Sequence, residues 1–268
     1  MALFSTHLPV AVGDETRGQD WKSHKREDAR TVTSSSRHAL LDNASHRDLA
    51  VVTTAGAQWG DGVMGCLVVP SEFRAVAAHY PIVFRRDGQS GRFAALALFG
   101  FDQGENLFLA GDRWDAAYVP LAHAVQPFLI GRTRDADEVP QVHIDLAHAR
   151  VGAPGGQRLF DDAGAPTPYL AAKAEQLGAL DAGWRATPAF LAALEHHGLL
   201  EPFTLDVPLA EGSTRSLVGY HIIAEDRLAA LDGAALGELN AQGYLLPIYM
   251  AVAALGRFAD LMARRGRA

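Results

Sequence analysis

The chain is poor in cysteine: Cys66 is the only one among 268 residues, so no intrachain disulfide can form. Cys66 stands in the apolar run CLVV, and we interpret it as a small buried hydrophobic residue. The first residues lack the basic region and long apolar run of a signal peptide. The longest apolar run, residues 244–255, is too short to span a bilayer. These absences predict a cytoplasmic protein without a transmembrane segment.

An excess of positive charge is also absent. The formal net charge is -7 and the isoelectric point is about 5.8. Nucleic acids and anionic membranes favour basic surfaces, so no nucleic-acid partner is expected. The hydrophobic share of 49% and the charged share of 21% are typical of a soluble globular protein.

Residues 1–37 are charged and poor in aliphatic side chains, which predicts a flexible polar N-terminal extension. The remaining residues, 38–268, are expected to form a single domain. From residue 49 to residue 146, short apolar runs alternate with turn sequences such as RDGQSG and DQGEN, which predicts strands in hairpins. These runs include residues 107–110, 116–119 and 127–130.

The apolar period then lengthens. Residues 169–184 and 187–200 have helical spacing, with Thr187-Pro188 predicted to begin the second helix and Gly198 to end it. Residues 202–209 and 216–224 read as strands, and residues 227–243 and 247–266 as two further helices. The predicted class is therefore α+β, with mainly antiparallel strands in the first half and helices concentrated in the second half.

The sequence motifs of common enzyme classes are weak or missing. Residues 60–65 spell GxGxxG, but the run CLVVP follows it, where a dinucleotide site needs a helix. A loop between two strands is the better interpretation. The chain contains no GxSxG, P-loop, HExxH or CxxC sequence, so hydrolase, NTPase, zincin and thioredoxin functions have no motif support.

His143 and Asp145 form an HxD pair on a predicted strand, where residues two apart point to the same face. Non-haem iron oxygenases present two of their three ligands in this way. His221 is a candidate third ligand, as are His196 and His197, and Arg227 is a candidate clamp for a 2-oxo acid. This alternative function is an Fe(II)- and 2-oxoglutarate-dependent oxygenase. The competing interpretation is a half-exposed strand with polar residues facing solvent.

The stretch VVPSEFRAVAAHYPIVF, residues 68–84, places an acid, an imidazole and a phenol around one proline bend. Ser71 is predicted to cap a helix that begins at Glu72. Phe73, Ala77 and Tyr80 fall at i, i+4 and i+7 and are predicted to be buried. The proline then turns the chain into a strand. These roles in folding explain the stretch without a catalytic glutamate–histidine pair.

The same stretch resembles a signature of the SapC family. The order of motifs continues with ALALFGFDQGENLFL, DRWDAAYVP, RLFDDAGAPT and GYHIIAEDRLAAL, so the resemblance spans about residues 40–265. The resemblance departs from the family pattern at Ala124-Val125-Gln126, where the family often has a basic cluster, and at Ala224, where it usually has an aspartate. His143 is not a regular feature of the family either.

The resemblance implies a soluble, non-catalytic accessory or binding protein linked to bacterial surface-layer or outer-membrane uptake systems. It carries no established catalytic residues, and it implies an unidentified protein or small-molecule partner and no cofactor. Aromatic side chains and a Gly-Glu-Asn turn can form the rim of a pocket. The candidate binding residues on this block are Glu72, Tyr80, Glu105, Asn106, Trp114 and Tyr118. Core packing is an equal alternative for the tryptophan and Tyr118, as turn formation is for Glu105 and Asn106.

Overall fold

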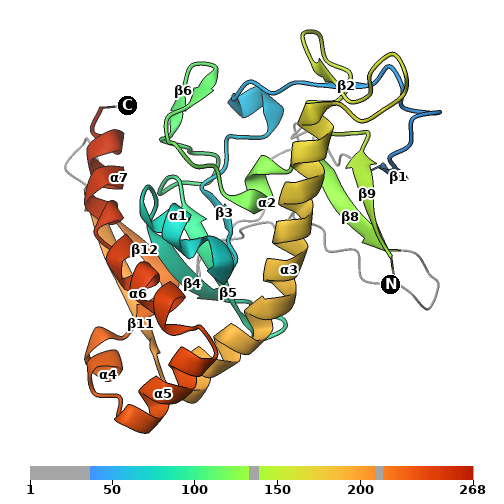
Figure 1. Cartoon of the computed structure of the whole chain (residues 1–268). Coiled ribbons are helices and arrows are strands. Elements are labelled where there is room, and N and C mark those ends of the chain that lie inside the picture. Colours follow the sequence, from blue (N-terminus) through green and yellow to red (C-terminus); the bar gives the residue numbers. More distant parts are fainter. Residues whose placement is uncertain (1–36, 133–138, 209–213, 268) are drawn as a thin grey trace, which may run out of the picture.

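A computed structural model describes residues 37–132, 139–208 and 214–267 (Figure 1). It confirms the α+β class, with antiparallel sheets and with the helices concentrated in the C-terminal half. The predicted N-terminal extension lies outside the described residues, apart from Arg37. That residues 38–268 form a single domain stays a prediction.

The larger sheet has five antiparallel strands in the order β11-β12-β4-β5-β3. Its strands are β3 (Gly65–Leu67), β4 (Ile82–Arg86), β5 (Phe93–Leu98), β11 (Leu200–Pro208) and β12 (Thr214–Ile223). The pairing of β12 with β4, Tyr220 opposite Arg85, joins the late strands to the early ones.

The second sheet has three strands in the order β1-β9-β8, namely β1 (His38–Leu40), β8 (Phe128–Arg132) and β9 (Pro140–Asp145). Two short pairs are β2 (Ala50–Val51) with β10 (Gln157–Arg158), and β6 (Leu109–Ala110) with β7 (Arg113–Trp114). The predicted strand at residues 116–119 is wrong. The carbonyl of Tyr118 there accepts a bond from the Tyr80 hydroxyl, and Pro120 begins helix α2 (Leu121–Ala124) directly afterwards.

The other helices are the 3-10 turns η1 (Ala57–Trp59) and η2 (Pro70–Glu72), then α1 (Phe73–Ala77), α3 (Pro168–His196), α4 (Glu225–Ala229), α5 (Gly233–Ala241), α6 (Leu245–Ala254) and α7 (Arg257–Arg265). Each of the two predicted C-terminal helices is thus divided. Asp232 caps α5 by accepting a bond from the amide of Ala235 at 2.8 Å, which separates α5 from α4.

Helix α3 is continuous over 29 residues, so the predicted helix start at Thr187-Pro188 is wrong. The actual start is the earlier pair Thr167-Pro168, where Thr167 accepts a bond from the amide of Leu170. Within the helix, the Thr187 hydroxyl donates instead to the carbonyl of Gly183 at 2.8 Å. The proline removes one backbone bond, and Figure 1 shows that the helix bends along its length. Gly198, with φ of 63°, ends it as predicted.

The stretch around the proline bend, residues 68–84, has the structural role predicted for it. Phe73, Ala77 and Tyr80 are buried as predicted. The predicted cap at Ser71 is wrong, because the 3-10 turn η2 begins earlier, after Val69. Glu72, the third residue of η2, reaches back through its Oε1 atom, which accepts a bond from the amide of Val69 at 3.0 Å. The GxGxxG stretch forms a loop, as predicted, but the 3-10 turn η1 precedes it rather than a strand, and its last glycine, Gly65, begins β3.

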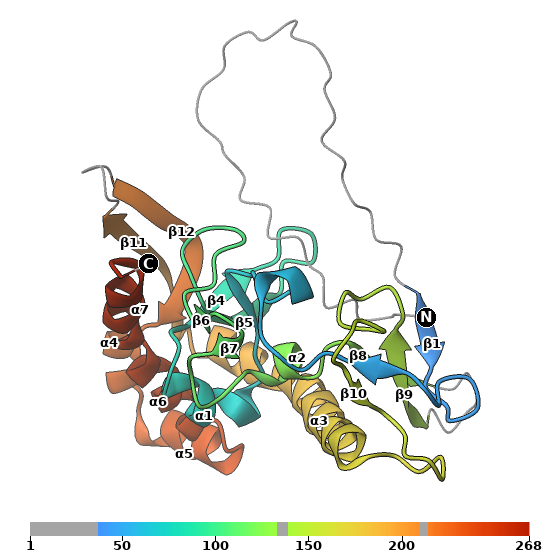
Figure 2. The same cartoon turned by 90° about the horizontal axis from the view of Figure 1, so that it is seen from above.

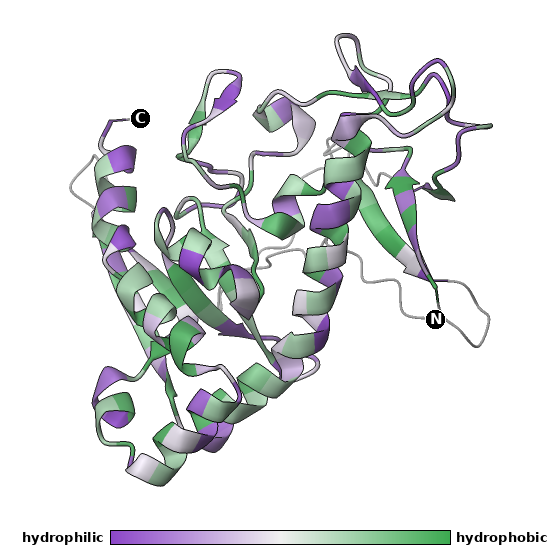
Figure 3. Ribbon diagram, viewed as in Figure 1, coloured by the Kyte–Doolittle hydropathy of each residue, from purple (hydrophilic) through white to green (hydrophobic). Residues whose placement is uncertain are grey.

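Two hydrophobic cores share helix α3. Its C-terminal half contributes Phe190 and Leu194 to the core of the five-stranded sheet. Its N-terminal half contributes Leu170 and Leu177 to a second core beside the three-stranded sheet. In Figures 1 and 2, the two sheets lie at opposite ends of the molecule, with α3 running between them. Figure 3 shows that β4 and β8, one from each sheet, are mainly hydrophobic.

One helical stretch among the described residues, Leu245–Arg265, is apolar and long enough to cross a membrane by composition and length alone. This is weak evidence, because core helices pass the same test. Here the stretch is α6 followed by α7, and Ile248, Ala251 and Phe258 lie in the larger core. The absence of a transmembrane segment stays a prediction.

Candidate functional site

Glu72 and His79 are not partners. Glu72 is only 5% exposed, and its Oε2 atom accepts bonds from the amide of Leu121 and the hydroxyl of Tyr118, both at 2.8 Å. Burial raises the pKa of this carboxyl group, although the bonds it accepts act in the opposite direction. No hydrogen bond or ion pair joins it to His79 within the described residues. His79 lines a separate groove with Arg257 and Arg264.

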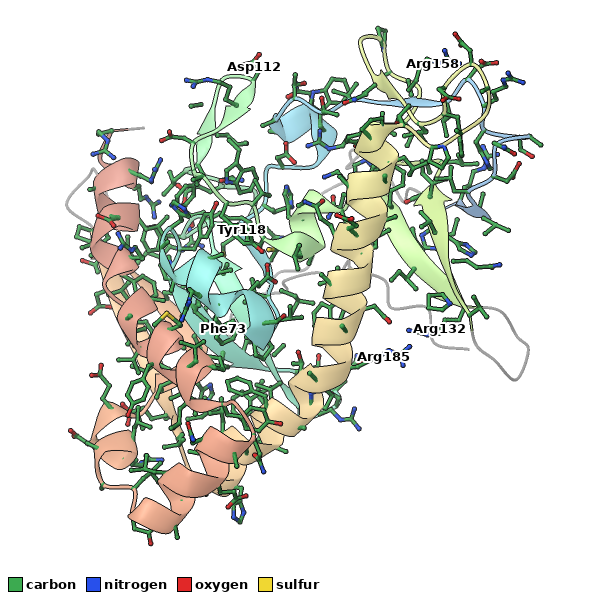
Figure 4. All side chains as sticks on the ribbon, viewed as in Figure 1. Phe73, Asp112, Tyr118, Arg132, Arg158 and Arg185 are labelled. Carbon is green, nitrogen blue, oxygen red and sulfur yellow. The ribbon has the colours of Figure 1, made fainter. Side chains whose placement is uncertain are left out.

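Tyr80 lies behind the segment that carries Trp114 and Tyr118. It is fully buried, receives a bond from the indole Nε1 of Trp114 at 2.7 Å, and donates to the carbonyl of Tyr118. Together with Glu72, it fixes both ends of this segment from inside. Figure 4 shows Tyr118 in the middle of the molecule.

A cavity of about 390 Å³ lies in front of this segment, where the two cores meet. Trp114 and Tyr118 contribute to one wall and α3 to another. The lining residues are Val52, Thr53, Ala55, Asp61, Trp114, Ala117, Tyr118, Val119, Leu121, His123, Ala124, Gln126, Arg150, Tyr169, Lys173 and Gln176. This volume falls within the range of small-molecule sites, roughly 300–1,000 Å³.

Asp61 organises the polar side of the cavity. It is 2% exposed and accepts bonds from Arg150 at 2.6 and 2.7 Å, from the amide of Gly56 at 2.7 Å and from the His123 ring at 2.8 Å. Burial alone would raise the pKa of Asp61, but the bonds from His123, Arg150 and Gly56 outweigh it and lower the pKa to about 2. The carboxylate thus stays ionised and holds the guanidinium in place.

Lys173 brings a second cation to the cavity from α3. Its ammonium group donates to the carbonyl of Ala124 at 2.6 Å and to the side-chain oxygen of Gln176 at 3.0 Å. It also lies 5.7 Å from the ring centroid of Tyr169. Burial, and to a smaller extent the charge of Arg150, lowers the pKa of Lys173. No ion pair joins Lys173 to a carboxylate in the part of the chain that the structure describes.

Four residues of the cavity were not predicted from the sequence, namely Asp61, His123, Arg150 and Lys173. For Lys173 a signal existed: lysine occurs only at positions 22, 25 and 173, although the chain has 24 lysine and arginine residues. After residue 25, arginine supplies every strongly basic side chain except Lys173, and this exception was a signal of a specific role. No local pattern connects Asp61 with Arg150, which lies 89 residues away.

Glu105 and Asn106 do not line the cavity. Glu105 accepts bonds from the amides of Phe101 and Asp102, at 2.7 and 3.3 Å. Asn106 donates to the carbonyl of Asp61 at 2.8 Å and accepts from the amide of Phe108 at 3.0 Å. Both side chains therefore stabilise their turn, and Asn106 also supports the loop that carries Asp61.

The structure separates the proposed iron ligands. His143 and Asp145 lie on β9 of the three-stranded sheet, and His221 lies on β12 of the five-stranded sheet. Asp145 accepts bonds from the amides of Arg37 and Ala147, both at 3.0 Å. Across the described ranges, no three histidine, cysteine, aspartate or glutamate side chains are placed to hold one metal ion. His196 and His197 end α3, and the candidate clamp Arg227 donates to the carbonyl of Gly198 at 2.6 Å.

Comparison with protein-family models matches residues 41–261 to the family described as SapC. The chain belongs to the SapC family. The match covers most of the described fold, from the three-stranded sheet to α7, and it confirms the resemblance found in the sequence. No curated protein and no solved structure matches the chain. Ala124 and Gln126, at which the sequence is expected to differ from the family pattern, line the cavity.

Proposed function

We propose that this SapC-family protein is a non-catalytic binding or accessory protein, and that the cavity at the junction of its two cores is the ligand site. The observation that carries the proposal is the way the walls are held. Glu72 and Tyr80 fix the segment with Trp114 and Tyr118 from behind, and Asp61 fixes Arg150. Side chains that are held in place by buried bonds lose little freedom on binding, which favours affinity.

The state of the two buried acids favours binding over catalysis. A catalytic acid or base must reach the substrate with a free lone pair or proton. Asp61 already accepts bonds from Gly56, His123 and Arg150, and Glu72 accepts three further bonds. Both carboxylates are engaged in holding the protein together.

Family membership supports a proposal for the wider role. We propose that the protein is bacterial, soluble and cytoplasmic, and that it serves a surface-layer or outer-membrane uptake system with an unidentified partner. The alternative, an Fe(II)- and 2-oxoglutarate-dependent oxygenase, has no supporting observation, because its candidate ligands lie on two different sheets.

A ligand-observed NMR screen of small compounds against two tryptophan variants tests the proposal. Ala117 is exposed and lines the cavity, so Ala117→Trp fills part of the space. Ala179 is exposed on α3 outside the cavity, and Ala179→Trp is the matched control. We expect compounds that bind the wild type and Ala179→Trp but lose binding to Ala117→Trp. A screen in which every bound compound tolerates Ala117→Trp would reject the cavity as the ligand site.

A further inference from the structure

We infer that the ligand of this cavity is a compact monocarboxylate with an apolar or aromatic body, whose carboxylate binds the ammonium group of Lys173. This inference rests on the proposed function, since it names the class of ligand for the same site. Two observations support it: Lys173 contacts only neutral oxygens, and another wall of the cavity is aromatic and aliphatic.

The acidic residue in the lining is already paired. Among the described residues that line the cavity, Asp61 alone is acidic, and Arg150 donates two bonds to it. Lys173 is the other lysine or arginine of the lining, and the oxygens it contacts belong to neutral groups, the carbonyl of Ala124 and the amide of Gln176. No carboxylate of the described lining therefore pairs with the ammonium group of Lys173, and a ligand anion would supply that partner.

The ammonium group of Lys173 has a third N–H donor beyond the two that bond within the protein. A protonated lysine carries three N–H donors, and two of those of Lys173 are used within the protein. The side chain lines the cavity, so the third donor is available to a ligand there. A half-buried cation that lacks an acidic partner is stabilised when a carboxylate supplies both the charge and the acceptor.

The apolar or aromatic character of the ligand is inferred from the wall of the cavity that contains Trp114 and Tyr118. Trp114, Tyr118 and Leu121 offer aromatic and aliphatic surface to the same cavity. A volume of about 390 Å³ suits a small compound rather than a folded chain. A phosphate ester carries about two negative charges at neutral pH, so one lysine would leave it uncompensated. One lysine without a carboxylate partner therefore favours a carboxylate over a phosphate.

The test compares phenylacetate with its neutral analogue phenylacetamide, using NMR titration of the full chain. We expect the wild type to bind phenylacetate at least about tenfold more tightly, as hydrogen bonds to charged groups are stronger than neutral ones. Lys173→Met should lose this preference. Arg185→Met should keep it, because Arg185 lies on the same helix but is exposed and paired with Asp181 (Figure 4).

Equal binding of the two compounds to the wild type would overturn the inference, and this comparison does not depend on any variant being stable. If both probes lost binding to Ala117→Trp in that case, the cavity would remain the ligand site and only the choice of a carboxylate would fail. Tighter binding of phenyl phosphate than of phenylacetate, dependent on Lys173, would also overturn the inference. If no compound lost binding to Ala117→Trp, the proposed function itself would be rejected.

Discussion

At the residue scale, buried carboxylates determine how the cavity is built. Asp61 and Glu72 are among the few buried charged or polar side chains of the described residues, and each accepts several bonds. Removing one partner of such a group leaves the other buried without compensation, which is strongly destabilising. The two residues are therefore the most sensitive points of the site.

Replacing Asp61 by asparagine should destabilise the protein by about 3 kcal/mol or more at neutral pH, because Arg150 loses its counter-charge. The folded-state pKa of Asp61 is about 2, below its usual value of 3.8. Its contribution is therefore full above pH 3.8 and is lost as the pH falls through 2. The difference in unfolding free energy between wild type and Asp61→Asn should shrink over that window in urea titrations.

Asp112→Asn is the control, since Asp112 is exposed in the β6–β7 hairpin. It should change the unfolding free energy by less than about 0.5 kcal/mol. An Asp61→Asn variant as stable as this control would show that Asp61 does not support the cavity wall.

Glu72→Gln and Tyr118→Phe should be coupled in a double-mutant cycle. Their side chains share a bond of 2.8 Å, and Tyr118→Phe removes only its donor. We expect a coupling energy of about 1–3 kcal/mol from urea unfolding. Tyr249→Phe, on an exposed tyrosine, should show none with Glu72→Gln. A coupling near zero for the first pair would contradict the role assigned to Glu72.

Some of these residue-level features were predicted from the sequence pattern. The buried stripe of Phe73, Ala77 and Tyr80 was predicted because helical spacing within a few residues determines it. The bond between Glu72 and Tyr118 joins residues 46 apart, and periodicity carries no information about such pairs. Both residues were predicted to belong to the site because of the family resemblance, and their contact was not predicted.

At the scale of elements, α3 is the structural link between the cores. Gly183 allows it to approach η2 closely: a Cβ atom there would lie 2.5 Å from a methyl carbon of Val69. The sequence predicted a break nearby because Thr-Pro is a common helix start, and the same dipeptide at 167–168 does start the helix. Packing of both helix halves on separate cores overrides the local signal at Pro188.

Gly183→Ala should therefore destabilise the protein by about 1–3 kcal/mol, as an inserted methyl group forces α3 away from η2. Gly178→Ala on the same helix meets no atom within 4 Å and should stabilise by about 0.5–1 kcal/mol, because alanine favours helix. Thermal unfolding followed by circular dichroism measures both. Equal changes in stability at the two positions would mean that the close contact between Gly183 and Val69 does not limit the packing of α3.

At the scale of the whole molecule, the cavity exists because residues from distant parts of the chain meet. Asp61 precedes β3, Trp114 and Tyr118 lie in and after β7, Arg150 follows β9, and Lys173 lies on α3. The sequence predicted the class of fold and the location of many strands and helices, since these depend on local periodicity and turn residues. It could not predict which loops converge, since that depends on how the two cores pack on α3.

The most direct measurement is the mapping of backbone amide chemical-shift changes while phenylacetate is added to the wild-type protein. We predict that the largest changes fall at residues 114–126, 150 and 169–176, which surround the cavity. Changes concentrated instead at the exposed apolar residues Val218, Leu246 and Tyr249, with none around Lys173, would contradict the account.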